Sequence, residues 1–134
     1  MSEKLKELDD FIDQWPDSMK ECRQIFLSLK ELLQHLPQVS MEFIARPGVS
    51  YSLRGVHQEQ QDKPLFVMVD VIDDDPRWLS VCFYGEMVTD PDECGDFVPG
   101  GLLGADAVCF DIESDNATML TYVKERIREA HAAS

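Results

Sequence analysis

The chain has 134 residues, of which 44% are hydrophobic and 28% are charged, and its formal net charge is −14 at pH 7. This length predicts one domain, and the composition is that of a globular protein, not of a disordered acidic segment. A net charge this negative repels phosphate backbones and anionic lipids, which argues against nucleic-acid and membrane partners.

Two helices are predicted at the start of the chain. Apolar residues recur at helical spacing over residues 5–15 and end before Pro16, so this first helix packs within the domain or across a homodimer axis. Ser18 and Glu21 have the spacing of a capping box, which predicts the start of a longer helix that ends near Pro37. The wide apolar stripe of this second helix is typical of a helix that packs on a sheet.

Five strands are predicted after these helices, and the first two form a hairpin over residues 38–56. Pro47 and Gly48 supply the fixed φ and the positive φ of a type II-like turn between them. A final helix closes the chain, with Ser114 or Asp115 as its cap. Hairpin-length connections favour a mainly antiparallel sheet with helices mainly on one face, so the predicted fold class is α+β. The other strands are predicted at residues 64–72, Trp78–Tyr84 and 107–112.

Acidic residues are concentrated in the second half of the chain. Residues 62–116 hold 14 acids and only two bases, Lys63 and Arg77, whereas the rest of the chain has 12 acids and 10 bases. Residues 85–105 show no clear period and predict a long loop that is functional or poorly ordered. Such a charge distribution attracts cations or basic partners. The leading hypothesis is a non-enzymatic module that binds a basic protein surface through Asp90, Asp92, Glu93 and Asp96.

The alternative is a divalent-cation-binding protein or a metal-dependent enzyme. Asp73, Asp74 and Asp75 offer the clustered carboxylates that hard cations require, although Asp-Asp-Asp-Pro is also ordinary turn chemistry. Residues 90–101 begin like a calcium loop, but position twelve is Gly101 instead of a glutamate, and the preceding segment is not helical. An EF-hand is therefore rejected, and a looser shared cation site requires at least three carboxylates from the two loops to converge.

Three other kinds of site are considered. Arg46 and Arg54 lie in the predicted hairpin, where they form ion pairs with nearby acids or an anion-binding pocket. Cys94 is a candidate nucleophile, but its acidic neighbours disfavour the thiolate, so an enzyme is the less favoured interpretation. Four aromatic residues form core, or line a small-molecule pocket between the main helix and the sheet: Phe43, Tyr51, Phe66 and Trp78.

Targeting and redox features indicate a cytoplasmic protein. The first residues contain no basic segment followed by an apolar run, so a secretory signal is not predicted. No apolar run approaches the roughly 18 residues that span a bilayer. Cys22, Cys82 and Cys109 lie among apolar residues and are interpreted as reduced, buried side chains.

The end of the chain also resembles a known group of domains. Residues 101–106 (Gly-Leu-Leu-Gly-Ala-Asp) lead into a strand over residues 108–112 and then into a helix over residues 120–131. This glycine-containing loop, strand and helix resemble the end of small bacterial α+β domains of unknown function, the YjbR and TfoX N-terminal-like group and related families. The resemblance implies that fold and a bacterial origin. Some of those relatives are labelled DNA-binding, and the acidic charge argues against that activity here.

Overall fold

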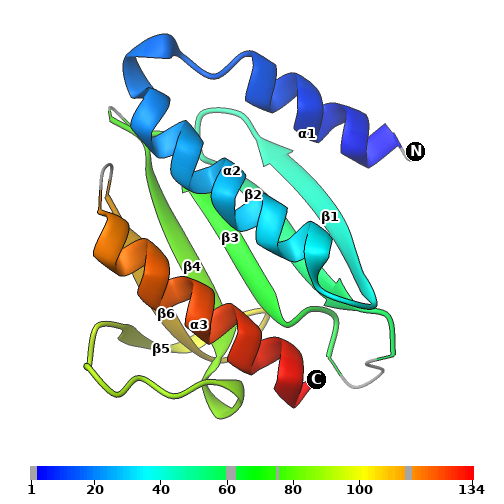
Figure 1. Ribbon diagram of the computed structural model, residues 1–134, viewed down its shortest axis with the longest axis vertical. Helices are drawn as coiled ribbons and strands as arrows, with labels where there is room; N and C mark the ends of the chain where they lie inside the picture. Colours follow the sequence, from blue (N-terminus) through cyan, green and yellow to red (C-terminus); the bar gives the residue numbers. More distant parts are fainter. Residues whose placement is uncertain (1–2, 60–62, 75, 114–115) are drawn as a thin grey trace.

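The computed structural model describes residues 3–59, 63–74, 76–113 and 116–134, and it forms an antiparallel sheet with α-helices on one side (Figure 1). The strand order is β1-β2-β3-β4-β6-β5. The α+β class is confirmed, but the sheet has six strands instead of the predicted five. The main elements are α1 (Glu3–Asp13), α2 (Lys20–His35), β1 (Val39–Arg46), β2 (Ser50–His57), β3 (Val67–Ile72), β4 (Trp78–Tyr84), β5 (Asp96–Leu102), β6 (Ala105–Ile112) and α3 (Ala117–Ala133).

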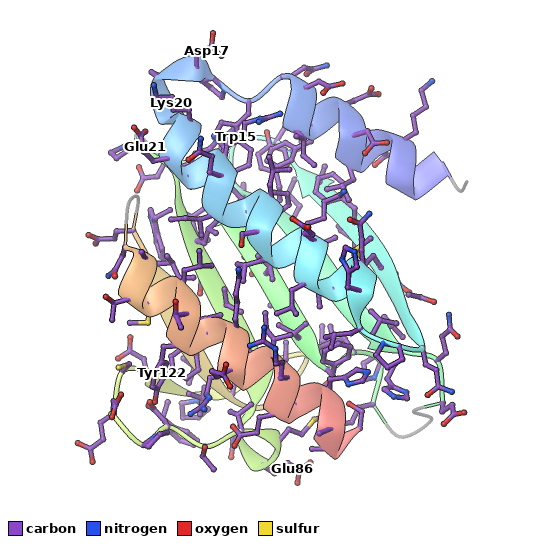
Figure 2. All side chains as sticks on the ribbon, viewed as in Figure 1. Trp15, Asp17, Lys20, Glu21, Glu86 and Tyr122 are labelled. Atoms are coloured by element: carbon purple, nitrogen blue, oxygen red, sulfur yellow. A yellow bond between two sulfur atoms is a disulfide. The ribbon has the colours of Figure 1, made fainter. Side chains whose placement is uncertain are left out.

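The two N-terminal helices are present, but the predicted capping box is wrong. The 3-10 turn η1 (Asp17–Met19) precedes α2, and no side chain caps the start of either element. Trp15 lies beneath this turn, and its ring N–H donates to the Met19 carbonyl at 3.1 Å (Figure 2). The apolar stripe of α1 packs within the molecule, because Leu8, Ile12 and Trp15 are all buried.

The β1–β2 hairpin is confirmed together with its turn. The Val49 amide donates to the Arg46 carbonyl at 2.9 Å, and Gly48 between them has a φ of +84°. A positive φ at this position suits a type II turn and favours glycine. Asp73 gives the hairpin a second support, because its carboxylate accepts the Gly48 amide at 3.0 Å.

The two faces of the sheet differ in chemistry. Alternation along the strands directs their apolar side chains toward α2 and α3, as expected for a half-buried antiparallel sheet. We call the opposite face the open face, since the described helices all lie on the other side (Figure 1). The core beneath the helices includes the fully buried side chains Phe26, Leu29, Leu33, Leu53, Val69, Val81, Phe83, Phe110 and Ile127.

β5 is the strand that the sequence pattern missed. It was predicted to be part of a loop over residues 85–105, because Pro99 and two glycines interrupt the alternation that marks a strand. Its first residues pair with β6 in regular register, from Asp96 opposite Cys109 to Val98 opposite Ala107. A register shift then bends the strand before pairing resumes near the tip of the hairpin. The bend allows the tip to cross the open face, where Leu103 lines a cavity formed with β1, β2 and β3.

Helix α3 completes the layer that covers the sheet. Its cap is Asn116, whose side-chain oxygen accepts the Met119 amide at 3.0 Å. The cap had been predicted at Ser114 or Asp115, and both lie outside the described residues. Within the part of the chain that the structure describes, no helix is both long and apolar enough to cross a membrane.

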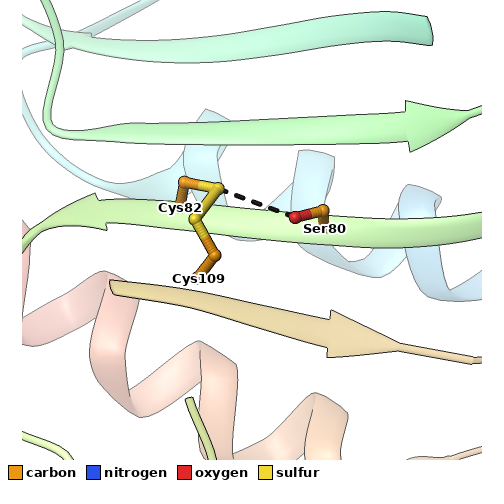
Figure 3. Close-up of a disulfide and its surroundings, with 3 residues drawn as sticks. All are labelled: Ser80, Cys82 and Cys109. Atoms are coloured by element: carbon orange, nitrogen blue, oxygen red, sulfur yellow. Dashed lines mark hydrogen bonds between the residues drawn. A yellow bond between two sulfur atoms is a disulfide. The ribbon is translucent and has the colours of Figure 1, made fainter. Parts of the chain in front are cut away.

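Cys82 and Cys109 form a disulfide between β4 and β6, so the prediction that both are reduced is wrong (Figure 3). The two residues are direct partners in the register of these strands, with their Cα atoms 4.1 Å apart. The Ser80 hydroxyl lies 3.6 Å from the Cys82 sulfur. Cys22 is a buried free thiol as predicted, and burial raises its pKa to about 11 against a smaller lowering by Arg77.

Candidate functional site

The acids predicted to bind a metal support turn structure. Besides holding Gly48, Asp73 accepts from the Arg77 guanidinium at 3.4 Å. Asp74 is exposed, and its backbone amide donates to the Ile72 carbonyl at 2.9 Å. Asp75 lies outside the described residues. Among the residues that are described, no group of three or more histidines, cysteines and acids is arranged to hold a metal ion.

The aromatic residues predicted to line one pocket are divided between three places. Phe43 and Tyr51 line a cleft of about 470 Å³ between α1 and the sheet, together with Arg77. Phe66 is fully buried in the core. Trp78 pairs with Ile72 and therefore faces the open face. The cleft itself is occupied at its inner end by the Arg77 guanidinium, which lies 5.4 Å from the centre of the Tyr51 ring.

The loop between β4 and β5 is pinned to α3 through Asp90. Its carboxylate accepts from the Cys94 and Gly95 amides at 2.9 Å each and from the Tyr122 hydroxyl at 2.5 Å. Tyr122 projects from α3 toward this loop (Figure 2). Burial tends to raise the pKa of Asp90, but these hydrogen bonds and Arg126 outweigh it and lower the pKa. Three other acids predicted to bind a partner are exposed: Asp92, Glu93 and Asp96.

The two predicted groups of acids do not meet. Asp73 and Asp74 precede Trp78 at one end of β4, whereas the loop with Asp90 follows Tyr84 at the other end (Figure 1). Among the described residues, the two loops therefore do not form a shared cation site.

Cys94 does not have the surroundings of a nucleophile. Its sulfur lies 3.8 Å from the Asp92 carbonyl oxygen, to which it donates. Desolvation, followed by the carboxylates of Asp90 and Asp92, raises the pKa of the thiol. The reactive thiolate is disfavoured in this position.

A distinct group of acids gathers around the β5–β6 hairpin. Asp96 and Glu113 are close enough to Asp111 that, after burial, their negative charges raise its pKa. Like charges placed side by side on one sheet face destabilise the sheet. These carboxylates lie toward the β6 and β5 edge of the open face.

A cleft of about 420 Å³ lies on the opposite face of the same hairpin, because Phe97 pairs with Val108 whereas Asp96 pairs with Cys109, and successive strand residues point to opposite faces. It is lined by Glu86, Phe97 and Asp106 among other residues, and the Phe97 side chain is 64% exposed. Lys63 pairs with Glu86 and lies 4.9 Å from the centre of the Tyr84 ring, so the cleft already accommodates one cation on an aromatic face. We define the acidic surface as Glu86, Asp96, Phe97, Asp106 and Asp111; it extends around the β5 edge of the sheet, with Asp96 and Asp111 on the open face and Phe97 on the other.

A second cavity, of about 160 Å³, lies between the open face and the tip of the β5–β6 hairpin. Cross-strand register places Ile44, Ser52 and Asp70 in one row on β1, β2 and β3. Arg46 and Arg54 also line the cavity, each on the same face as this row. The hairpin tip covers it with Gly101 and Leu103.

Asp70 is the unusual group in this second cavity. The Ser52 hydroxyl donates to its carboxylate, but the oxygen Oδ1 is buried and has no hydrogen-bond partner in the described part of the chain. Burial raises the pKa of Asp70, and Ser52, Arg54 and Arg46 offset this only in part. Within the described residues, neither arginine makes an ion pair, and Arg54 donates only to the Ser52 hydroxyl at 3.4 Å.

Sequence reasoning identified Arg46 and Arg54 as a candidate anion pocket but missed the other half of this cavity. Asp70 interrupts the apolar run of β3, and Ser52 occupies a buried position in β2. A polar residue within a buried strand was the available signal, because such residues require partners from neighbouring strands.

Comparisons with protein-family models, with curated proteins and with solved structures find no match for this chain.

Proposed function

We propose that the protein is a non-enzymatic binding module that holds a basic protein segment on the acidic surface. The observation that carries this proposal is the clustering of acids around Asp111, where burial and the charges of Asp96 and Glu113 raise its pKa. A cationic partner would remove the repulsion and gain from the surrounding negative field.

Phe97 supplies the apolar contact that such a partner needs. An aromatic residue that is 64% exposed offers a large apolar area in the cleft that Glu86 and Asp106 also line. Interfaces commonly combine one aromatic anchor with a charged rim, and the rim mainly governs association rate and salt dependence. The preferred segment therefore contains several lysines or arginines and at least one apolar side chain.

The test compares three variants of the whole protein on an array of synthetic peptides with graded positive charge, each made with and without a leucine. Asp96→Asn with Asp111→Asn removes two charges from the acidic surface. Asp9→Asn with Asp13→Asn removes two exposed charges from α1 and is the matched control. Phe97→Ser removes the apolar anchor, at little cost to folding because the side chain is largely exposed.

We expect wild-type affinity to rise with peptide charge and to fall with salt. The first double variant should weaken binding about tenfold and flatten the salt dependence, since roughly 1.4 kcal/mol is tenfold in affinity. Phe97→Ser should abolish the advantage of leucine-containing peptides. Equal losses in the α1 control, or binding that does not depend on peptide charge, would contradict the proposal.

The similarity to YjbR and TfoX N-terminal-like domains, a cytoplasmic location and homodimer formation stay predictions. Cation binding by Asp73, Asp74 and Asp75 also stays a prediction.

A further inference from the structure

Independently of the acidic surface, we propose that the cavity beneath the β5–β6 tip binds a small 2-hydroxycarboxylate. In this assignment Arg46 and Arg54 hold the carboxylate, and Asp70 accepts the hydroxyl. The site has three parts: the two arginines, the Asp70 carboxylate with its unpartnered oxygen, and the apolar side chains that line the cavity.

The two arginines are the reason for assigning a carboxylate group to the ligand. The chain carries a net charge of −14, yet neither Arg46 nor Arg54 is ion-paired within the described residues. Both line the cavity, on adjacent strands β1 and β2. Planar guanidinium groups recognise carboxylates through paired N–H donors, which makes them suited to a ligand of this charge.

Asp70 is the reason for assigning a hydroxyl group to the ligand. Its Oδ1 atom is buried without a donor in the described part of the chain, and an unsatisfied buried acceptor is costly. The second side-chain torsion of aspartate is broad, so a small rotation presents an oxygen to the cavity. A ligand ammonium would also donate and would be attracted by the Asp70 carboxylate, but the two guanidinium groups that line the cavity repel its positive charge. A neutral hydroxyl satisfies the acceptor without that repulsion.

The cavity dimensions restrict the rest of the ligand. Its volume of about 160 Å³ is well below the roughly 300 Å³ at which pockets for drug-sized molecules begin. Ile44, Met68 and Leu103 supply apolar lining, which suits a methyl or another short alkyl group. Nucleotides and peptides are too large for this space.

The experiment measures binding of three ligands of nearly equal size to the intact protein by calorimetry and by amide chemical shifts. Lactate carries the carboxylate and a hydroxyl, propionate lacks the hydroxyl, and alanine replaces it with an ammonium. We expect lactate to bind at least tenfold more tightly than either analogue. Amide resonances of β2 and of residues 101–104 should shift on binding.

Variants separate the two halves of the site. Arg54→Gln should weaken lactate and propionate alike by at least tenfold. Asp70→Asn removes the charged acceptor and should make the affinities for lactate and propionate equal. Arg128→Gln, which changes an exposed arginine on α3, is the control and should alter neither affinity.

Since Arg54 is half-buried, Arg46→Gln provides a second, exposed test of the carboxylate contact. Equal affinities for lactate and propionate in the wild type would overturn the hydroxyl assignment. Undiminished lactate binding in both arginine variants would overturn the site. Tighter binding of inorganic phosphate, insensitive to Asp70→Asn, would identify a general anion site and overturn the ligand class.

Discussion

Asp70 is a single residue whose partly buried carboxylate lowers the stability of the folded protein. Its carboxylate is half-buried and one of its oxygens has no partner among the described residues, which is why its pKa is raised. A group whose pKa is raised on folding stabilises the folded state while it is protonated. That contribution is lost as pH rises through the folded-state pKa. Above that pKa, the ionised Asp70 therefore lowers the free energy of unfolding.

Asp70→Asn should consequently stabilise the ligand-free protein at neutral pH by about 1 kcal/mol, which corresponds to a rise of a few degrees in Tm. The difference should shrink as pH falls below the pKa of Asp70, because both proteins are then neutral at this position. Thermal unfolding between pH 3.5 and pH 8 measures it, with Asp13→Asn on α1 as an exposed control. A difference that stays constant with pH, or a destabilised variant at pH 7, would argue against this account.

Local sequence predicted residue roles where the partners are close along the chain. Gly48 was identified as the turn residue because the type II turn needs a positive φ within four consecutive residues. The role of Asp70 depends on Ser52 and Arg54, which reach it through strand pairing across a loop. Asp73 was placed correctly in a turn, but its contact with Gly48 joins two turns that are distant in sequence.

At the scale of elements, strand β5 and the disulfide are the features that sequence could not supply. β5 has no alternating pattern, and it exists as a strand because β6 offers it partners. Cys82 and Cys109 are 27 positions apart in apolar segments, and only the register of β4 and β6 makes them opposite. The hairpin β1–β2 was predictable because its pattern and its turn agree locally.

The disulfide should be a substantial source of stability. A cross-link that closes a loop of this length is expected to contribute roughly 3 to 4 kcal/mol by restricting the unfolded chain. Replacing Cys82 and Cys109 together by alanine should lower the free energy of unfolding in urea by that amount. Reductant should have the same effect on the wild type and none on the double variant.

Counting thiols provides an independent check of the same bond. Alkylation of the denatured, unreduced protein should label Cys22 and Cys94 alone, and mass spectrometry reads the number of labels. Four labels would contradict the disulfide.

At the scale of the whole molecule, charge is the dominant property. A folded body with a net charge of −14 repels itself, and counter-ions reduce that repulsion. Monovalent salt should therefore raise Tm steadily, by a few degrees between low and moderate ionic strength.

The same measurement tests the cation-binding alternative. An ion that binds only the folded state adds RT ln(1 + [L]/Kd), or about 2.7 kcal/mol at a hundredfold excess over Kd. At matched ionic strength, Ca²⁺, Mg²⁺, Mn²⁺ and Zn²⁺ should act no differently from one another if the charge is a screened surface. A shift with one ion, reversed by EDTA and lost in Asp74→Asn, would instead establish a specific cation site.

The β5–β6 hairpin belongs to both proposed sites. Its base presents Asp96 and Phe97, and its tip places Leu103 over the cavity on the open face. The disulfide ties β6 to β4, so the tip and the base of the hairpin share one cross-linked strand. Two occupants that each order this hairpin would be thermodynamically coupled through it. Each must then change the affinity of the other by the same factor, and a metabolite beneath the tip would set the strength of a protein contact at the base.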